Sequence, residues 1–146
     1  MPFEKSAGAV IFREERGKIY YLLLHYPTSS RTKKDYWDFP KGHIEKGEKE
    51  IETVKREVEE ETGLKKIEFV EGFKEWIKYF FKDQGKTVFK IATFYLIETK
   101  EKNINVSFEH IGYQWLPYEQ ALDQVTFKNA KEILKKAHNF LSKESI

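Results

Sequence analysis

The stretch GHIEKGEKEIETVKREVEEETGL, residues 42–64, determines how the rest of the chain is interpreted. It begins as a polar loop and then predicts a helix that starts near Glu48 and ends at Gly63, since glycine commonly terminates helices. Ile51, Val54 and Val58 follow the i, i+3, i+7 spacing of a buried apolar stripe. The pattern therefore predicts an amphipathic helix that packs on a sheet, and Glu52 and Arg56, an i, i+4 pair, are expected to steady its polar side.

The last turns of this helix carry clustered carboxylates. Glu57, Glu60 and Glu61 stand at i, i+3 and i+4, so their side chains share one face of the helix. Like charges at this spacing repel, and an ordinary structural helix gains nothing from them. A hard divalent cation does gain, because it prefers clustered oxygen ligands. The cluster indicates a metal site, and the alternative is a solvated acidic face.

Composition indicates the class of protein. With 146 residues, 40% hydrophobic and 16% aromatic, the chain predicts one domain, residues 1–146, that is too apolar to be disordered. Apolar runs stay well short of the ~18 residues of a membrane span, and MPFEKSAGAV does not resemble a signal peptide. Cysteine is absent, which fits a cytoplasmic location. We expect no membrane partner.

The charge distribution points to a polyanionic ligand. The formal net charge of +2 is too small to indicate a nucleic-acid partner by itself. Residues 42–64 contain eight Glu against four Lys or Arg, so the remaining surface is basic. An acidic metal cluster in basic surroundings suits a phosphorylated substrate that cations bridge.

The segments around the helix predict a mixed sheet. Apolar, β-rich runs separated by turn residues predict strands, and a short helix follows at 117–121 with a longer amphipathic one at 127–141. Strands, helix, strands and helix in this order predict an α/β (α+β) fold, with a mixed β-sheet between helices. The predicted strands are 6–13, 19–26, 67–81, 87–99 and 110–116.

The stretch 42–64 resembles the Nudix box, G-x5-E-x7-R-E-U-x-E-E-x-G-U, in which U is a bulky aliphatic residue. A full match by chance at one site has a probability below about one in ten million. The resemblance implies a Nudix-type α/β/α sandwich. The defined positions are filled by Gly42, Glu48, Arg56, Glu57, Val58, Glu60, Glu61, Gly63 and Leu64.

In that family the box holds Mg2+ or Mn2+ and hydrolyses a nucleoside diphosphate linked to another moiety. The resemblance implies more than one bound ion. It makes Glu57, Glu60 and Glu61 the metal ligands, helped by a backbone carbonyl near Gly42, with Glu57 and Glu61 catalytic. Glu48 and Arg56 would instead pair with each other and brace the loop.

Beyond the box, nearly the whole chain is similar to asymmetric diadenosine tetraphosphate (Ap4A) hydrolases of the animal and archaeal type. This similarity implies hydrolysis of Ap4A to ATP and AMP. The resembling segments are AGAVIF (7–12), WDFPKGHIEKGE (37–48), EGFKEWIKYF (71–80), GKTVFKIATFYL (85–96), FEHIGYQWL (108–116) and TFKNAKEIL (126–134).

Residues outside the box acquire roles from this resemblance. Glu109 matches an extra carboxylate near the metals, either a further ligand or a group that helps activate water; the alternative is a surface glutamate. His110 is expected to be structural or a donor to a ligand. Tyr79 and Phe127 match two aromatic residues that sandwich an adenine, although both residue types also suit a core.

Basic residues are expected to contact the polyphosphate. Lys41, Lys82 and Lys86 match or lie close to such positions, and the alternative for the last two is that they are turn charges. Tyr36 departs from the pattern, because animal-type members tend to carry a histidine there. A tyrosine still donates a hydrogen bond to phosphate.

Other functions remain open at this point. One is another Nudix activity, on RNA 5′ ends, diphosphoinositol polyphosphates or nucleoside triphosphates. Another is a nucleotide-binding or sensing module without turnover. RNA 5′ ends are thus the one nucleic-acid partner that the sequence suggests, and a monomer is the expected oligomeric state.

Overall fold

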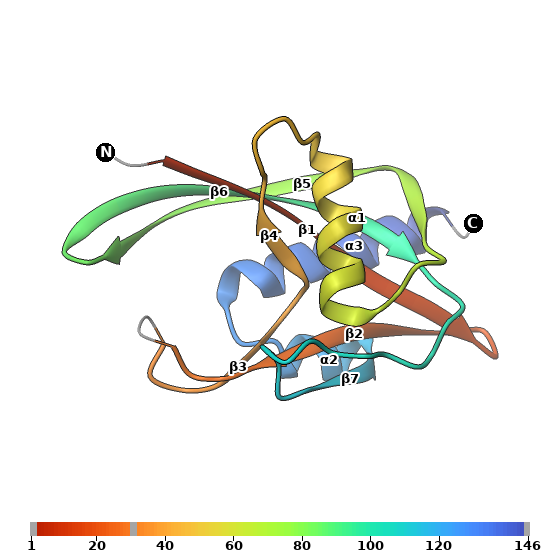
Figure 1. Cartoon of the computed structure of the whole chain (residues 1–146). Coiled ribbons are helices and arrows are strands. Elements are labelled where there is room, and N and C mark those ends of the chain that lie inside the picture. The colour runs from red at the N-terminus through yellow and green to blue at the C-terminus, as the bar shows by residue number, and fades with distance from the viewer. Residues whose placement is uncertain (1–2, 30–31, 145–146) are drawn as a thin grey trace.

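The computed structural model describes residues 3–29 and 32–144, and its strands form one sheet with helices on both faces (Figure 1). The predicted α+β fold with a mixed sheet between helices is confirmed. Within the described ranges, none of the helices has the length and apolarity needed to cross a bilayer. The elements are β1 (Phe3–Glu15), β2 (Lys18–Tyr26), β3 (Tyr36–Asp38), β4 (Lys41–His43), α1 (Glu50–Thr62), β5 (Glu68–Asp83), β6 (Lys86–Glu98), β7 (Gly112–Pro117), α2 (Tyr118–Gln124) and α3 (Lys128–Glu144).

The sheet is opened between β1 and β2. The main strand order is β3-β2-β1-β6-β5, with β1 and β6 parallel and the other neighbouring pairs antiparallel. β1 and β2 pair next to their turn, from Phe12↔Tyr21 to Glu15↔Lys18. Farther from the turn, β4 pairs with β1 and β3 pairs with β2. The short strands that lead into the box therefore lie in the opening of the sheet.

Two apolar clusters attach the helices to the sheet. On one face Val54 and Val58 of α1 pack on β1 and β2 residues such as Ile11 and Leu22. On the other face α2 and α3 contribute Ala121, Ala130, Ile133, Leu134 and Ala137. Burying a single Leu or Val side chain contributes roughly 1.5–3 kcal/mol, so the first cluster holds the box helix on the sheet and the second holds α2 and α3.

Helix α1 corrects two details of the sequence prediction. Ile51 was expected in the buried stripe but is 36% exposed, because it lies in the first turn, at the end of the helix away from the core contacts of Val54 and Val58. Glu52 does not form the i, i+4 pair with Arg56 that its spacing suggests; its Oε1 accepts from the backbone N–H of Lys49 at 2.8 Å. The helix ends, as predicted, at Gly63, which has a φ of 77°.

The strand predicted at 67–81 is a single long strand with an irregularity. β5 pairs with β6 on both sides of a register shift that lies between Phe69 and Lys74. Gly72, inside this shift, has a φ of 93°. The shift sets which alternate side chains of β5 face each side of the sheet.

Candidate active site

A cavity of about 1040 Å³ lies at the opening of the sheet. It joins the box to the wall formed by β5 and β6 and to the start of α3. The structure thus brings most of the sequence-predicted site residues to one place. The predicted residues that line the cavity are Tyr36, Lys41, Gly42, Glu57, Glu60, Glu61, Tyr79, Glu109 and Phe127.

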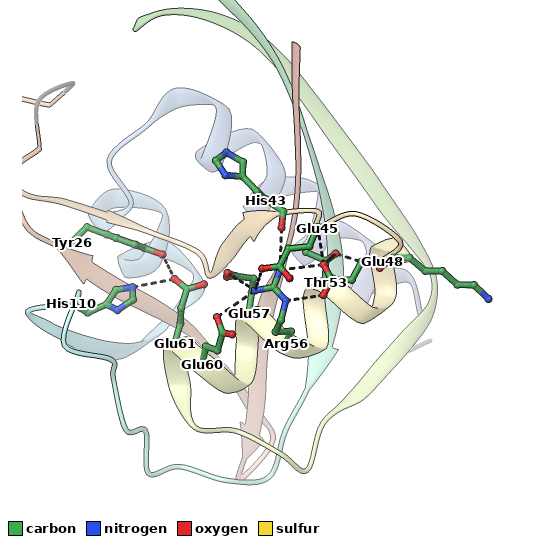
Figure 2. A network of polar contacts seen from close by, with 11 residues as sticks. Tyr26, His43, Glu45, Glu48, Thr53, Arg56, Glu57, Glu60, Glu61 and His110 are labelled. Atoms are coloured by element: carbon green, nitrogen blue, oxygen red, sulfur yellow. Dashed lines mark hydrogen bonds and ion pairs between the residues drawn. The ribbon is translucent and has the colours of Figure 1, made fainter. Parts of the chain in front are cut away.

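Glu48 and Arg56 form the centre of a polar network (Figure 2). Arg56 Nε donates to Glu48 Oε2 at 2.7 Å, and Thr53 Oγ1 donates to Glu48 Oε1 at 2.7 Å. The hydrogen bond from Arg56, followed by that from Thr53, lowers the pKa of Glu48 to about 2. Both oxygens of Glu48 are therefore occupied by protein donors. The predicted brace between Glu48 and Arg56 is confirmed.

Arg56 also connects the loop to the acidic face. Its NH2 donates to the backbone carbonyl of His43 at 3.0 Å. Its NH1 lies 3.4 Å from Glu57 Oε1 and 3.4 Å from Glu60 Oε2. The guanidinium thus holds the β4–α1 loop against the helix and offsets part of the carboxylate charge.

Glu57 lies against the backbone of Gly42. A Cβ atom at position 42 would come 2.1 Å from the carboxyl carbon of Glu57, so the close approach requires glycine. Burial, and next the Glu61 charge, raise the pKa of Glu57 to about 7, and the nearby Arg56 opposes this rise. A bound cation would relieve the same repulsion.

Glu61 is held by residues outside the box (Figure 2). Its Oε1 accepts from the Tyr26 hydroxyl at 3.0 Å and lies 3.1 Å from His110 Nε2. Burial, followed by the Glu61 charge, raises the pKa of Tyr26 well above its ordinary value, so this hydroxyl remains a donor. His110 Nδ1 in turn lies 2.8 Å from Ser107 Oγ, which is consistent with the predicted donor role of His110.

The second carboxylate oxygen of Glu61, Oε2, differs from Oε1 in its surroundings. Oε2 is buried and, among the described residues, makes no hydrogen bond. A buried carboxylate oxygen without a donor is costly unless a cation or water satisfies it. Sequence reasoning identified Glu61 but missed Tyr26, because 35 positions separate the two residues, and it missed Ser107, which reaches Glu61 only through His110.

A divalent cation fits this set of donors chemically. The unpartnered oxygen of Glu61, the raised pKa of Glu57 and the close approach at Gly42 all indicate carboxylates arranged for a positive charge. Within residues 3–29 and 32–144, however, the acidic side chains do not already converge as a set of three ligands. The side chain of Glu60 is 57% exposed and lies beside Arg56.

Aromatic rings line the cavity together with the carboxylates. Tyr79 and Phe127 line the cavity, and the ring of Phe127 is 39% exposed. The Tyr36 ring stacks on Tyr26, with centroids 4.9 Å apart, and lies 5.2 Å from the Phe127 centroid. Tyr36 thus belongs to an aromatic row that joins the predicted adenine position to the Tyr26 ring beside Glu61.

The lysines divide into two groups. Lys41 lines the cavity and bonds to Asp38 at 2.9 Å. Burial alone would lower the pKa of Lys41, but the Asp38 carboxylate outweighs it and raises the value to about 12. Lys90 also lines the cavity, and sequence reasoning missed it. The sequence feature that could have revealed Lys90 is its place between Val88 and Ala92, on the side of β6 that is buried.

Lys82 and Lys86 do not line the cavity. Along β5, alternate side chains point to opposite sides, and Tyr79 and Phe81 point to the cavity, so Lys82 points away. Its Nζ donates to Thr87 Oγ1 at 2.6 Å. Lys86 begins β6 at the end of the hairpin. The expectation that these two lysines face the polyphosphate is corrected by this geometry.

Glu109 lies on the exposed loop between β6 and β7 and lines the cavity. Its charge contributes to the raised pKa of Glu57, so the two carboxylates sense each other. Its neighbour Phe108 also lines the cavity and is 98% exposed. Neither the conformation of this loop nor the position of Phe108 at the cavity was apparent from the sequence.

The amino-acid sequence of this chain is similar to those of known proteins. A model of the NUDIX domain matches residues 2–137. The asymmetrical bis(5′-nucleosyl)-tetraphosphatase of Mus musculus is 33% identical and spans 94% of this chain and 95% of its own. An RNA pyrophosphohydrolase of Nitratiruptor is 34% identical over 75% of this chain and 76% of its own.

Solved structures of other proteins resemble the fold of this chain. The crystal structure of a C. elegans Ap4A hydrolase binary complex superposes with a TM-score of 0.80 at 30% identity, covering 95% of this chain and 98% of the other. The MutT protein of Methanosarcina mazei gives a TM-score of 0.67 at 28% identity, with 94% of each chain covered. The described fold is therefore one that these proteins share.

Proposed function

The chain belongs to the NUDIX family, and from this premise we propose that it hydrolyses dinucleoside polyphosphates, converting Ap4A and water to ATP and AMP. The observation that carries the proposal is the cavity that the box carboxylates line together with Tyr79 and Phe127. The similarity to the mouse and C. elegans enzymes over nearly the whole chain supports the same substrate.

The aromatic residues would bind one adenine. Tyr79 and Phe127 would stack on the two faces of the base, which needs little hydrogen bonding. Tyr36 packs beside Phe127, with ring centroids 5.2 Å apart, and steadies that ring. We assign Tyr36 to this aromatic wall, where its hydroxyl can also donate to a phosphate oxygen.

Two lysines would contact the polyphosphate. Lys41 and Lys90 both line the cavity, and an ammonium group suits phosphate as a point charge. Asp38 fixes the Lys41 ammonium at 2.9 Å and so limits its motion. Lys82 and Lys86 are left out of the proposed phosphate contacts.

The carboxylates would hold Mg2+ or Mn2+. NUDIX hydrolases generally use divalent metal ions, and we assign Glu57, Glu60 and Glu61 as ligands, with Glu109 and the Gly42 carbonyl as further donors. When bound, such ions neutralise phosphate charge and lower the pKa of a water molecule. Tyr26 and His110 orient Glu61, and we assign to Glu109, which lines the same cavity, the role of accepting a proton from the attacking water. As the water oxygen bonds to phosphorus, one phosphorus–oxygen bond breaks and divides the substrate into ATP and AMP.

Product analysis tests this function. Purified protein is incubated with Ap4A and Mg2+, and the nucleotides are separated; equal amounts of ATP and AMP are expected, and EDTA should abolish turnover. Two molecules of ADP would overturn the asymmetric cleavage. In ¹⁸O-labelled water, the labelled product identifies the phosphorus that is attacked.

A matched pair of variants tests the ligand assignment. Glu57→Gln should lower turnover by roughly a thousandfold or more, because removal of a charged group from such a site costs several kcal/mol. Glu59→Gln is the control, since Glu59 is exposed on the same helix and does not line the cavity. Near-native activity of Glu57→Gln with retained folding would show that the assignment is wrong.

The RNA pyrophosphohydrolase relative supports a second candidate substrate. A 5′-triphosphorylated oligoribonucleotide is therefore offered in the same assay, with pyrophosphate or phosphate release as the readout. A larger kcat/KM for the RNA than for Ap4A would make removal of RNA 5′ phosphates the main activity.

A further inference from the structure

One face of the β5–β6 hairpin is not used by the proposed active site. Ile77, Tyr79 and Phe81 point to the cavity, so the alternate residues of β5 point to the opposite side of the sheet. The hairpin extends beyond α1, which covers the inner part of that side (Figure 1). We call this uncovered surface the arm face. Its members are Phe3, Lys5, Lys74, Trp76, Lys78, Phe80, Lys82 and Phe89.

Aromatic rings are unusually exposed on the arm face. Trp76 is 54% exposed, Phe80 61% and Phe3 49%. Phe89 connects two of them, with centroids 5.3 Å from Phe3 and 5.1 Å from Phe80. Contiguous exposed apolar groups of this kind mark interaction sites more often than isolated ones do. The arm face therefore favours a partner that has flat apolar groups.

Its charged groups are lysines. Lys74, Trp76, Lys78, Phe80 and Lys82 alternate along β5, whereas Glu75 and Asp83 fall on the other register. Lys74 is paired with Glu50 at 3.1 Å. In the part of the chain that the structure describes, no carboxylate lies within 4.0 Å of the ammonium groups of Lys5, Lys78 or Lys82. The partner should be anionic.

Two lysines of the arm face place their ammonium groups beside aromatic rings. Lys78 Nζ lies 5.6 Å from the Trp76 ring centroid, and Lys5 Nζ lies 5.9 Å from that of Phe3. A hollow of about 280 Å³ beside Trp76 is lined by Lys5, Lys74 and Ile91, and by Glu50. Same-side residues of a strand recur at roughly 6.6 Å, so positive charge and ring surface alternate along the arm at regular spacing.

A polymer with flat rings and a repeating negative charge matches this surface. We propose that the arm face binds single-stranded nucleic acid, with bases stacked on Trp76 and Phe80 and phosphates near Lys5 and Lys78. The net charge of +2 did not suggest such a partner, because the acidic box offsets the clustered lysines in the total. The proposal does not depend on the Ap4A activity, because the arm face is on the side of the hairpin opposite the cavity.

Fluorescence anisotropy with labelled oligonucleotides tests the proposal. The probes are single-stranded RNA and DNA dodecamers with 5′-hydroxyl ends, in EDTA, so that a phosphorylated end and bound metal cannot recruit the active site. Trp76→Ala and Phe80→Ala should each raise the Kd about tenfold. Lys78→Ala should reduce the salt dependence of log K by about 0.7 per lost phosphate contact. Unequal Kd values for the RNA and DNA probes identify which strand is preferred.

Controls use matched residues elsewhere. Tyr113→Ala removes a 38% exposed ring from β7, and Lys55→Ala removes an exposed charge from α1; both should leave the Kd unchanged. The double variant Lys5→Ala/Lys78→Ala keeps all the aromatic rings, so the hairpin should remain folded. Weaker binding by this variant is therefore due to the lost charges and not to unfolding of the hairpin. Quenching of tryptophan fluorescence by the probe, absent in Trp76→Phe, supports stacking at this side chain.

Several outcomes would overturn the proposal. These are no binding by the wild-type protein, an unchanged Kd for both Trp76→Ala and Phe80→Ala, or equal losses with the Lys55 control. Sedimentation that shows a dimer which Trp76→Ala converts to a monomer would assign the arm face to a second copy of this chain instead. Failure of Ap4A hydrolysis would leave the result of this binding test unaffected.

Discussion

Nε2 of His110 lies 3.1 Å from Oε1 of Glu61, although 49 positions separate the two residues in the chain. The Tyr26 hydroxyl donates to the same oxygen at 3.0 Å, and Oε2 is left without a protein partner in the described part of the structure. The orientation of one box carboxylate is therefore determined by a strand and a loop outside the box. Glu48, in contrast, has both oxygens occupied by protein donors.

Tyr26→Phe should weaken metal binding by about 10–100-fold, because it removes one donor that orients Glu61. The ring stacked on Tyr36 is retained, so the aromatic wall should survive. Calorimetric titration with Mg2+ measures the affinity directly. Turnover should fall at low Mg2+ and recover as Mg2+ is raised. The control is Tyr113→Phe on β7, and an unchanged Mg2+ affinity for Tyr26→Phe would contradict the positioning role.

Glu57→Gln should stabilise the metal-free protein. The folded pKa of Glu57, about 7, lies above the ordinary value of 4.5, so the folded state binds this proton more tightly than the unfolded state. Metal-free stability should therefore fall as pH rises from 4.5 to about 7, and the cost should persist above that range. Glutamine carries no charge, so the Glu57→Gln variant should not show this loss of stability.

Thermal unfolding at pH above 7 measures the effect of Glu57→Gln. In EDTA the variant should melt above the wild type, whereas added Mg2+ should raise the Tm of the wild type much more than that of the variant. Glu59→Gln, on the exposed side of α1, serves as control. A lower Tm for Glu57→Gln in EDTA would show that Glu57 is stabilising without metal.

Glu48→Gln should flatten the acid side of the stability profile. The folded pKa of Glu48, about 2, lies below its ordinary 4.5, because Arg56 and Thr53 bond to the charged form. This contribution is present above pH 4.5 and is lost as pH falls through about 2. Urea unfolding across this range should show a smaller loss for the variant than for the wild type. Equal slopes would mean that the Arg56 bond is not maintained in solution.

Tyr79→Ala and Phe127→Ala should each raise the KM for Ap4A more than they lower kcat. Loss of base stacking on an aromatic side chain costs about 1–3 kcal/mol, which is about 5–150-fold in affinity. Phe127→Trp should largely restore the KM, since it restores a ring. Tyr113→Ala is the control for removal of an exposed ring. An unchanged KM in both alanine variants would remove the adenine sandwich from the mechanism.

Local patterns predicted much of this fold. The helix at 50–62 and the strands β1, β2, β5, β6 and β7 were recognisable because a period near 3.6 or 2 depends on neighbouring residues alone. The same local spacing brought out the acidic face, whereas the Glu48–Arg56 brace was implied by the resemblance to the Nudix box. Prediction failed for Ile51, because exposure at the end of a helix depends on where the sheet lies beneath it.

By itself, the sequence determined the chemistry available to this protein: clustered carboxylates, a braced loop and a glycine at position 42. Tertiary structure decided which groups complete the site. Tyr26 and Lys90 reach the cavity through long-range strand pairing, and His110 reaches Glu61 from the loop between β6 and β7. The register shift in β5 selects Tyr79 for the cavity and Lys82 for the arm face. Hydrogen bonds between distant residues and the side to which a strand residue points both depend on register, and register is set when the strands pair.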